Sequence, residues 1–351
     1  MTERTKPISV LIAEDSRTQR EFLLSLLEEA GGFEIVGVAG DGVEAVEETG
    51  RLRPDIILMD CHMPRATGIE ATRIIMERFP TPIVIVSSTL AREEIEQTFD
   101  AIKCGALAFL PKPTLQALEG DADPDGDSLI QTLRLMAEVK VVGRRLKASA
   151  VAKPVRVLAP AGIRLIGVGG STGAPGVIAD ILAALSTTPT PPILIVQHMA
   201  NGFVEGFARW LSGATRVPVS VASQGMSLVR GHAYLCPDNH HMGLSAGGRI
   251  ALSDGAPEEG FRPSANFLFR SISEHCGGAA AGVLLTGMGR DGATGLLALR
   301  RAGGVTIVQD EASCVVFGMP REAIAVGAAQ HVLPPNEIAR VITEMTAHAG
   351  A

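Results

Sequence analysis

Residues 8–15 read ISVLIAED, a run of branched apolar residues that ends in two carboxylates. Such a short, almost wholly apolar run is typical of a strand buried on both faces of a parallel sheet. Ser16 follows as a helix N-cap, and apolar residues then recur at helical spacing from Phe22 to Leu27. The stretch predicts a strand leading into an amphipathic helix, the first unit of an α/β fold.

The same alternation continues through the first third of the chain. Strands are expected at 33–39, 56–59, 82–87 and 107–110, and helices at 42–49, 68–79 and 92–103. Strands that alternate with helices predict a doubly wound, flavodoxin-like parallel sheet of five strands. Residues 113–127 are polar and proline-containing and are expected to form a surface loop. Residues 128–147 are expected to form a helix with a basic last turn.

A second α/β pattern follows residues 148–162, an Ala/Pro/Val-rich stretch that is typical of an interdomain linker. A strand at 164–169, a glycine-rich turn, a helix at 176–185 and a strand at 193–197 make one βαβ unit. Further strands are expected at 217–221, 233–236, 249–252, 281–286 and 305–308, with an antiparallel hairpin near 233–252. The predicted organisation is a first domain at 1–127, a helix and linker at 128–162, and a mostly parallel α/β hydrolytic domain at 163–351.

Composition limits the classes to which the protein can belong. The chain has 351 residues, 46% hydrophobic and 20% charged, which is ordinary for a globular protein longer than one core usually supports. A net charge of −7 gives no electrostatic reason to expect nucleic acid or an anionic membrane as partner. There is no apolar signal core and no run of about 18 apolar residues, so we expect a cytoplasmic protein without direct membrane insertion.

The five cysteines are widely spaced and form no CxxC motif, so they indicate neither a zinc site nor a redox dithiol. We expect them to be buried, unreactive thiols. They are Cys61, Cys104, Cys236, Cys276 and Cys314.

Polar side chains are expected to gather at the carboxyl edge of the first sheet. Glu14 and Asp15 end the first strand, Asp60 the third and Ser87 the fourth, and Lys112 follows the fifth. Carboxylates there could hold Mg²⁺, which prefers hard oxygen ligands. Asp60 could then act as the nucleophile that forms an acyl phosphate, with Lys112 and Ser87 holding the phosphoryl oxygens. Taken singly, each residue is more often a helix cap or a turn former, so the prediction rests on the combination.

Residues 8–115 resemble the response-regulator receiver family. The matching residues are Glu14, Asp15, Asp60, Met63, Pro64, Gly68, Ser87, Phe109, Lys112 and Pro113. The resemblance implies that a histidine kinase phosphorylates Asp60. It also implies Mg²⁺ bound by Asp15, Asp60 and the backbone carbonyl of His62, with Glu14 helping through water.

The same resemblance implies that Ser87, Phe109 and Lys112 carry the receiver switch, and that the Lys112–Pro113 bond is cis. Cys61 and His62 depart from the pattern, since related esterases usually carry an apolar and an acidic residue there. We expect this departure to affect the lifetime of the acyl phosphate rather than its formation.

A second set of strand-end residues points to ester hydrolysis. Ser171 lies in GVGGSTGAP between a strand and a helix, His198 follows the next strand in IVQHM, and Asp291 lies in LLTGMGRDG. If the three loops converge, Ser171 attacks a carbonyl, His198 takes its proton and Asp291 orients the imidazole. The order Ser–His–Asp argues against the α/β-hydrolase fold, whose triad follows the order Ser–Asp–His. Read singly, GGSTG could be a phosphate-binding turn, and His198, one of eight histidines, could be structural.

Residues 163–345 resemble the catalytic domain of the CheB family, the chemotaxis protein-glutamate methylesterases. The matching stretches are IGVGGSTGAP, ILIVQHM, GHAYLCPDNHHM, RPSANFLFRSIS, GVLLTGMGRDGATGL and VQDEASCVVFGMPREAI. The resemblance implies the triad Ser171, His198 and Asp291, a role for Thr172 in orienting the histidine, and an oxyanion donor in the Met288 backbone N–H. Ala174 and Asn266 depart from the family pattern, and we expect neither to touch the triad.

The resemblance implies a phosphorylation-activated hydrolase that demethylates receptor glutamates and deamidates receptor glutamines, with no cofactor for the esterase reaction. It implies a CheA-type histidine kinase and methyl-accepting chemoreceptors as partners. Two alternatives stay open: an adaptor that only binds receptors, against which the intact triad argues, and an esterase serving a chemosensory array with an output other than swimming.

Overall fold

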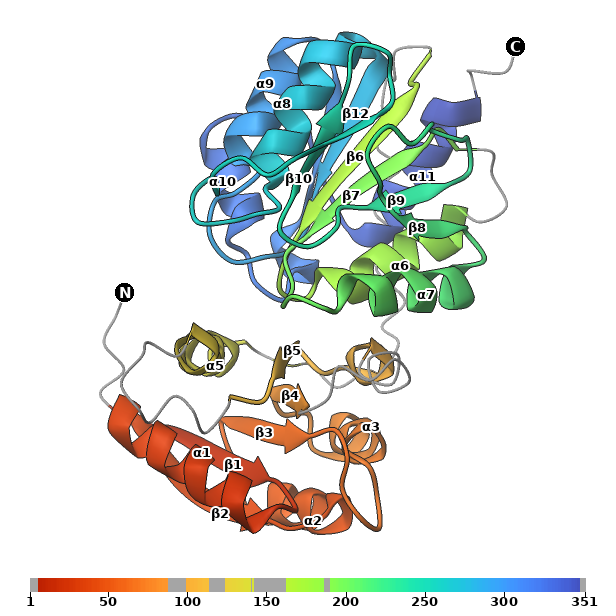
Figure 1. Ribbon diagram of the computed structural model, residues 1–351. Helices are drawn as coiled ribbons and strands as arrows, with labels where there is room; N and C mark the ends of the chain where they lie inside the picture. Colours follow the sequence, from red (N-terminus) through yellow and green to blue (C-terminus); the bar gives the residue numbers. More distant parts are fainter. Residues whose placement is uncertain are drawn as a thin grey trace. The chain divides into compact units, whose positions relative to one another are not determined.

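The computed structural model describes residues 6–87, 99–113, 124–139, 141, 162–185 and 190–347, and the structural statements below concern these residues. The chain divides into two compact units, Met1–Lys153 and Pro154–Ala351, each built around its own sheet (Figure 1). Most of the predicted loop at 113–127, most of the helix predicted at 92–103 and nearly all of the predicted linker lie outside the described residues. The domain boundaries at 127 and 162 therefore stay predictions.

The first unit is a five-stranded parallel sheet, as predicted, with the order β2-β1-β3-β4-β5. Its strands are β1 (Ile8–Ala13), β2 (Phe33–Ala39), β3 (Ile56–Asp60), β4 (Ile83–Ser87) and β5 (Ala108–Pro111). β3 and β4 are buried along their whole length, which explains their unbroken apolar sequences. Because β1, β3 and β4 are neighbours, the polar residues at their carboxyl ends meet at one edge.

Helices connect these strands, and the sequence signals mostly place them correctly. They are α1 (Arg17–Ala30), α2 (Gly42–Leu52), α3 (Gly68–Arg78) and α5 (Pro124–Met136). Ser16 caps α1 by accepting a hydrogen bond from the Gln19 backbone N–H at 3.4 Å. The helix predicted at 128–147 corresponds to α5, which both begins and ends earlier than predicted. Its start was missed because Pro124 was read as a loop residue. Proline suits the first helical position, where no N–H is needed.

The second unit is a seven-stranded, wholly parallel sheet with the order β14-β13-β12-β6-β7-β9-β8. Its strands are β6 (Leu165–Gly170), β7 (Ile193–Gln197), β8 (Val219–Val221), β9 (Ala233–Leu235), β12 (Ala280–Leu284), β13 (Val305–Gln309) and β14 (His331–Leu333). The chain builds outward from β6 on one side and then returns to β12 on the other. This reversal makes a topological switch point between β6 and β12, the place where parallel sheets commonly bind ligands.

The antiparallel hairpin lies later in the chain than predicted and outside this sheet. β10 (His241–Leu244) pairs with β11 (Ile250–Ser253) across a short turn. Residues 233–235, expected to begin the hairpin, instead form β9, which is parallel to β7 and β8. The sequence-based prediction paired strands that are close in sequence, whereas the fully buried AYL segment of β9 pairs with more distant partners.

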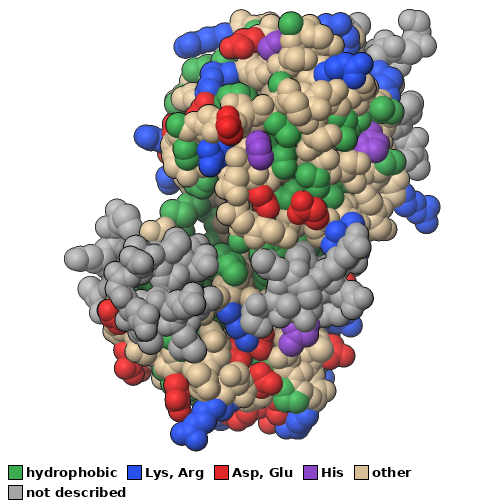
Figure 2. Space-filling view, viewed as in Figure 1, with side chains coloured by type: hydrophobic (Ala, Val, Ile, Leu, Met, Phe, Trp, Pro, Cys, Tyr) green, Lys and Arg blue, Asp and Glu red, His purple; other side chains and the backbone are tan. Residues whose placement is uncertain are grey.

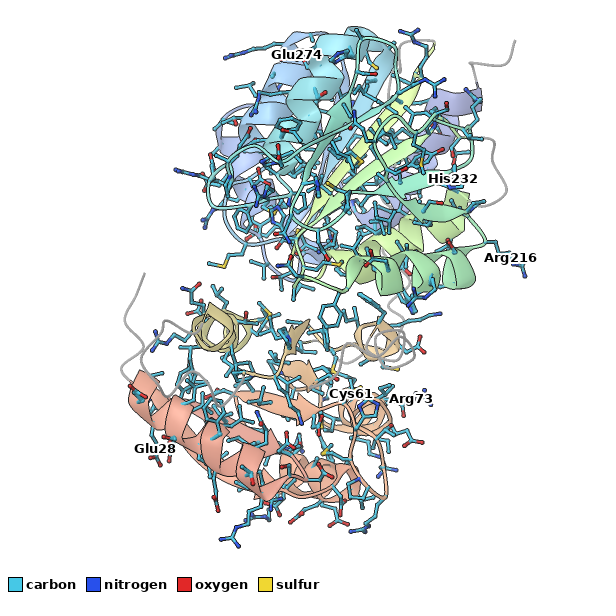
Figure 3. All side chains as sticks on the ribbon, viewed as in Figure 1. Glu28, Cys61, Arg73, Arg216, His232 and Glu274 are labelled. Carbon is cyan, nitrogen blue, oxygen red and sulfur yellow. The ribbon has the colours of Figure 1, made fainter. Side chains whose placement is uncertain are left out.

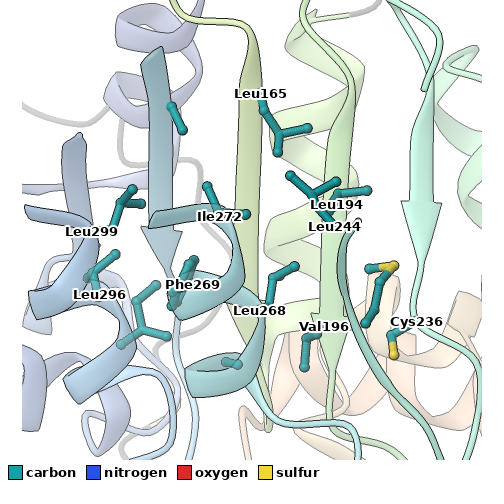
Figure 4. Close-up of a cluster of buried hydrophobic side chains, with 14 of the residues drawn as sticks. Leu165, Leu194, Val196, Cys236, Leu244, Leu268, Phe269, Ile272, Leu296 and Leu299 are labelled. Carbon is teal, nitrogen blue, oxygen red and sulfur yellow. The ribbon is translucent and has the colours of Figure 1, made fainter. Parts of the chain in front are cut away.

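Helices cover both faces of the second sheet. They are α6 (Ala174–Leu185), α7 (Val204–Thr215), α8 (Ala265–Cys276), α9 (Ala293–Arg301), α10 (Met319–Ala325) and α11 (Pro335–Ala347). α6 and α11 pack together against one face. On the other face, α8 and α9 bury Phe269, Leu296 and Leu299 against the strands in a core that extends to β10 (Figure 4). Because helices cover both faces of the sheet, we look for the polar residues of a functional site at the strand ends.

The surface carries acidic and basic side chains interspersed on the visible face of each unit (Figure 2). Within the described residues, no helix combines the length and the apolar character needed to cross a bilayer. No disulfide joins the five cysteines, which all lie among the described residues, and only Cys61 and Cys236 are buried. The expectation of five buried thiols was therefore wrong for Cys104, Cys276 and Cys314, which are half-buried.

Candidate functional site

Ser171 is positioned by the end of β6 and the start of α6. Its backbone N–H donates to the Thr286 carbonyl at 3.1 Å, and its own carbonyl accepts from Ala174, the first residue of α6, at 3.0 Å. Gly173 between them has φ +81°, and a Cβ there would lie 2.5 Å from the Val315 side chain. The glycine-rich sequence therefore allows a sharp strand-to-helix turn with Ser171 at its corner, 9% exposed.

His198 and Asp291 form a buried pair beside this turn. His198 follows β7, and its backbone N–H donates to the Gly170 carbonyl at 3.0 Å, which ties the histidine to the residue before Ser171. Its ring Nε2 lies 2.9 Å from Asp291 Oδ2, and the two side chains are 8% and 0% exposed. Nδ1 is buried and has no hydrogen-bond partner. The pairing at Nε2 leaves Nδ1 as the free basic nitrogen.

Asp291 is surrounded by hydrogen-bond donors, three of them from the start of α8 and one from the residue that follows Asp291. The donors are the Ser264 hydroxyl (2.7 Å) and the backbone N–H groups of Ala265 (2.6 Å), Asn266 (3.0 Å) and Gly292 (2.9 Å). Burial alone would raise the pKa of Asp291, but the bonds from His198, Asn266 and Ser264 outweigh it and hold that pKa below its ordinary value. Asp291 is therefore expected to be ionised at neutral pH although its side chain is fully buried.

The structure corrects the expectation that Ala174 and Asn266 do not touch the triad. Asn266 was expected not to touch the triad, yet its backbone N–H bonds to Asp291. The contact comes from the main chain, which the side-chain identity does not reveal. The Asn266 side chain instead accepts hydrogen bonds from Thr294 at 2.9 Å and Gly295 at 2.8 Å, which links α8 to α9. The expectation was wrong for Ala174 as well, because its backbone N–H donates to the Ser171 carbonyl from the first residue of α6.

The other predicted residues lie in the two loops around Ser171. The Thr172 carbonyl accepts from the Thr286 hydroxyl at 3.1 Å. Gly287 packs so closely on Ser171 that a Cβ there would lie 2.7 Å from the Ser171 Cβ, and Met288 follows with a 41% exposed side chain. Between Ser171 Oγ and His198, both described residues, no hydrogen bond is formed. The predicted roles of Thr172 and of the Met288 N–H stay predictions.

Two supporting residues were missed from the sequence. Gln197 is buried, and its amide Nε2 donates to the carbonyl oxygens of both Ser171 and His198 at 2.9 Å. Its position beside His198 in IVQHM was the only signal. Ser264 caps α8 and also donates to Asp291. RPS before a helical run is an N-cap pattern, but only the fold shows what the cap contacts.

Two other histidines of this unit, His232 and His241, have local partners. His232 (Figure 3) precedes β9, which is two strands from β6 in the sheet; it hydrogen-bonds the Ser220 hydroxyl at 2.9 Å and stacks on Tyr234. His241 hydrogen-bonds the Ala256 carbonyl and accepts from the Ser264 N–H. These contacts are structural, and they contrast with the carboxylate partner of His198.

In the first unit, the predicted residues at the strand ends do meet. Lys112 Nζ lies 2.7 Å from Glu14 Oε2 and 2.9 Å from Asp60 Oδ2, with all three side chains less than a tenth exposed. Burial raises the pKa of both carboxyls, with the neighbouring acids adding to the effect. Burial alone would lower the pKa of Lys112, but its bonds to Glu14 and Asp60 raise it. The lysine is therefore held as a cation against two carboxylates.

An acidic cluster that suits Mg²⁺ lies at this edge. One carboxylate oxygen from each of Glu14, Asp15 and Asp60 lies within 4.8 Å of the others, and hard oxygens are the ligands that Mg²⁺ prefers. Three carboxylates outnumber the single ammonium of Lys112, so a divalent cation fits the local charge. The buried Ser87 hydroxyl, which has no hydrogen-bond partner in the described structure, adds a donor suited to a bound oxyanion.

The remaining predictions for the receiver unit concern His62, Phe109 and the Lys112–Pro113 bond, and only the last of them is tested by the structure. The His62 backbone N–H donates to Asp60 Oδ1 at 3.3 Å, and ligation by the His62 carbonyl stays a prediction. Phe109 on β5 is half-buried against the core formed with α3, which leaves its switch role a prediction. The cis peptide bond of the described residues precedes Pro263, so the expectation of a cis Lys112–Pro113 bond was wrong. The trans form is intrinsically favoured before proline by about 0.5–1 kcal/mol.

Known proteins resemble both units. Residues 166–342 match the CheB methylesterase family, and residues 10–119 match the response regulator receiver domain family. The protein-glutamate methylesterase/protein-glutamine glutaminase 4 of Geobacter metallireducens is 46% identical over 96% of this chain and 99% of its own. The protein-glutamate methylesterase/protein-glutamine glutaminase 1 of Syntrophus aciditrophicus is 46% identical over 96% of this chain and 98% of its own.

Among solved structures, the CheB methylesterase catalytic domain of Thermotoga maritima is 33% identical, with a TM-score of 0.51. The match covers 53% of this chain and 100% of that domain. The likeness therefore extends from the sequence to the seven-stranded sheet that brings Ser171, His198 and Asp291 together. With its first unit matched as a receiver and its relatives aligned almost end to end, the chain belongs to the CheB family of protein-glutamate methylesterases/protein-glutamine glutaminases that carry a response-regulator receiver domain.

Proposed function

We propose that Ser171, His198 and Asp291 are the catalytic triad of this methylesterase and that the substrate is a glutamate γ-methyl ester on a chemoreceptor. Ser171 Oγ attacks the ester carbonyl carbon while His198 Nδ1 takes the hydroxyl proton. Ionised Asp291 holds the imidazole through Nε2 and stabilises its cation. The Met288 backbone N–H, in the loop that packs on Ser171, donates to the oxyanion.

The intermediate then collapses. The carbonyl re-forms, the C–O bond to the methoxy group breaks, and the His198 proton passes to the leaving oxygen, so methanol departs and Ser171 carries the glutamyl acyl group. A water molecule attacks this ester with His198 again as base, which releases the glutamate carboxylate and restores the serine. The same sequence on a glutamine carboxamide releases ammonia. Esters react more readily because methoxide is a better leaving group than amide.

One observation carries this proposal. The His198 ring is bonded to a buried, ionised carboxylate at Nε2 and has a buried, unpartnered Nδ1, in a loop that is hydrogen-bonded to the residue preceding Ser171. An unpartnered buried nitrogen is costly in a resting protein, so its retention favours a proton-transfer role. A purely adaptor function would not require it.

The test is methanol release from a methylated cytoplasmic fragment of a chemoreceptor. Ser171→Ala should lower turnover by about 10⁴–10⁶-fold while the fold is kept, as for other triad serines. Ser220→Ala is a matched control, because that serine bonds only a structural histidine, and it should keep wild-type turnover. Full activity in folded Ser171→Ala would contradict the triad.

For the receiver unit, we propose that a CheA-type histidine kinase phosphorylates Asp60 and that phosphorylation activates the esterase. Asp60 attacks the phosphorus atom and the phosphohistidine bond breaks, which leaves an acyl phosphate. Lys112 Nζ and the Ser87 hydroxyl hold the phosphoryl oxygens. Asp15, Asp60 and the His62 carbonyl would hold Mg²⁺, with Glu14 nearby, and the ion would supply positive charge against those oxygens.

We further propose that the enzyme works in the cytoplasm, on the cytoplasmic helices of methyl-accepting chemoreceptors, in chemotactic adaptation. The receiver and esterase together support this, because they join a phosphorylation signal to removal of receptor methyl groups. In the unphosphorylated protein, the receiver restricts substrate access, and phosphorylation shifts the population toward the open form. Methylation of the receptors in cells that lack the gene should rise.

A further inference from the structure

We propose that Phe261 is a positioning residue for the esterase reaction, one that fixes the plane of the His198 imidazole. The inference rests on the proposed catalytic role of His198. The two rings are stacked with their centroids 4.2 Å apart and their planes only 2° from parallel. Phe261 is half-buried and lies outside the core of the unit, so it does not serve merely as core filler.

The hydrogen bonds of His198 do not by themselves fix the ring. Its one ring bond runs from Nε2 to Asp291, and Nδ1 has no partner. A ring held at one atom can still tilt about that contact, which would move Nδ1 out of line with Ser171. A flat aromatic face against the whole imidazole removes this freedom, and it offers its π electrons to the imidazolium that forms when the proton is taken.

Phe261 is itself held in place by a tight turn. The backbones of Glu258 and Phe261 exchange two hydrogen bonds, of 3.0 and 2.9 Å. The two residues between them, Glu259 and Gly260, have φ values of +52° and +87°, as a two-residue hairpin turn requires. A glutamate rarely adopts this left-handed conformation, and such strain persists where the surroundings impose it.

Two ion pairs connect this turn to the elements that hold Asp291. Arg270 of α8 contacts both carboxylate oxygens of Glu258. Arg290, the residue before Asp291, bonds Glu259 at 3.0 Å. Three residues after Phe261, Ser264 donates to Asp291. The segment from Glu258 to Ser264 therefore contacts both the His198 ring, through Phe261, and Asp291, through Ser264.

The test compares full-length variants, each activated with a small-molecule phosphodonor, by methanol release from a methylated chemoreceptor fragment. Phe261→Leu keeps an apolar side chain but removes the ring, so kcat should fall about 10–100-fold with KM nearly unchanged. Phe261→Tyr keeps the stacked ring and should recover most of that loss. Glu258→Gln, which weakens the link to Arg270, should lower kcat less than Phe261→Leu.

A spectroscopic readout separates positioning from simple stability. In protein labelled with ¹⁵N-histidine, the His198 Nε2–H proton bonded to Asp291 should give a protected low-field signal, which Phe261→Leu should broaden and Phe261→Tyr should keep. Folded Phe261→Leu with wild-type kcat would overturn the inference, as would a rise in KM alone, which would mark substrate contact. Ser171→Ala in the same series tests the triad separately: if it is inactive while Phe261→Leu is fully active, only the positioning role fails.

Discussion

Asp291 keeps its negative charge although it is fully buried, because the start of α8 supplies its counter-dipoles. Backbone N–H groups at a helix N-terminus carry partial positive charge and lack partners within the helix. Ala265 and Asn266 direct two of these groups at the carboxylate, and Ser264 adds its hydroxyl. The carboxylate therefore anchors α8 as well as orienting His198.

This dual role has a pH signature. The pKa of Asp291 lies below its ordinary value in the folded protein, so the ionised form adds stability that is fully present above the unfolded-state pKa of about 3.9 and is lost as the pH falls below it. Asp291→Asn places an amide NH₂ among donors and should cost about 1–3 kcal/mol at neutral pH. Urea unfolding from about pH 7 to about pH 3 should show this difference shrinking in acid. A difference independent of pH would contradict the ionised state.

Asp60 has the opposite electrostatic setting, since burial and neighbouring acids disfavour its charge while Lys112 opposes them. Asp60→Asn should keep basal esterase activity and lose the response to a phosphodonor, because an amide does not accept the phosphoryl group. Asp41→Asn is the matched control: Asp41 caps α2, and asparagine also accepts the capping bonds. Methanol release with and without phosphodonor measures the effect, and activation of Asp60→Asn equal to that of the wild type would exclude Asp60 as acceptor.

At the scale of elements, the active site depends on loops that approach each other without side chains between them. Gly287 lies against Ser171, where an added Cβ would come within 2.7 Å of the Ser171 Cβ and 2.4 Å of Met319 Sδ. In a Gly287→Ala variant, contacts this short would force the loop after β12 away from Ser171. The loop carries both Met288 and Asp291, so a small displacement would disturb the proposed oxyanion donor and the proposed triad carboxylate together.

Gly287→Ala should therefore reduce esterase turnover by at least about 10²-fold, the cost expected of a displacement near 1 Å. Gly213→Ala in α7 adds the same methyl group where nothing lies within 4 Å, and it should raise stability by about 0.5–1 kcal/mol with activity unchanged. Thermal unfolding and methanol release on both variants give the comparison. Normal turnover in Gly287→Ala would show that the loop tolerates the shift.

The sequence could predict the strand ends well, because apolar runs that stop at a polar residue define where a buried strand meets its loop. That signal placed Glu14, Asp60 and Lys112 together, and likewise His198 and Asp291. It could not predict contacts that the main chain makes, such as Asn266 to Asp291, because any residue type supplies an N–H. It also could not find Phe261, whose position follows from a turn in the loop between β11 and α8.

At the scale of the whole molecule, the two units carry separable chemistry joined by one chain. If the unphosphorylated receiver restricts access to the esterase, its attachment keeps it at a high effective concentration near the site. Deleting residues 1–153 should raise basal methanol release above that of the intact, unphosphorylated protein. Adding the separate receiver should restore little inhibition at micromolar concentration. A folded deletion protein that is slower than the intact one would contradict inhibition by the receiver.

The switch point between β6 and β12 also has a consequence for the order in which the parts of the esterase unit are synthesised. β6 lies between β7, which follows it closely, and β12, which pairs Ala280 with Leu165 across most of the unit. A nascent chain leaves the ribosome amino-terminus first, so the serine and the histidine emerge well before the aspartate. If the proposed triad is correct, the receiver and Ser171 are both synthesised before the residue that completes the triad, so no ester is cleaved before the receiver is present.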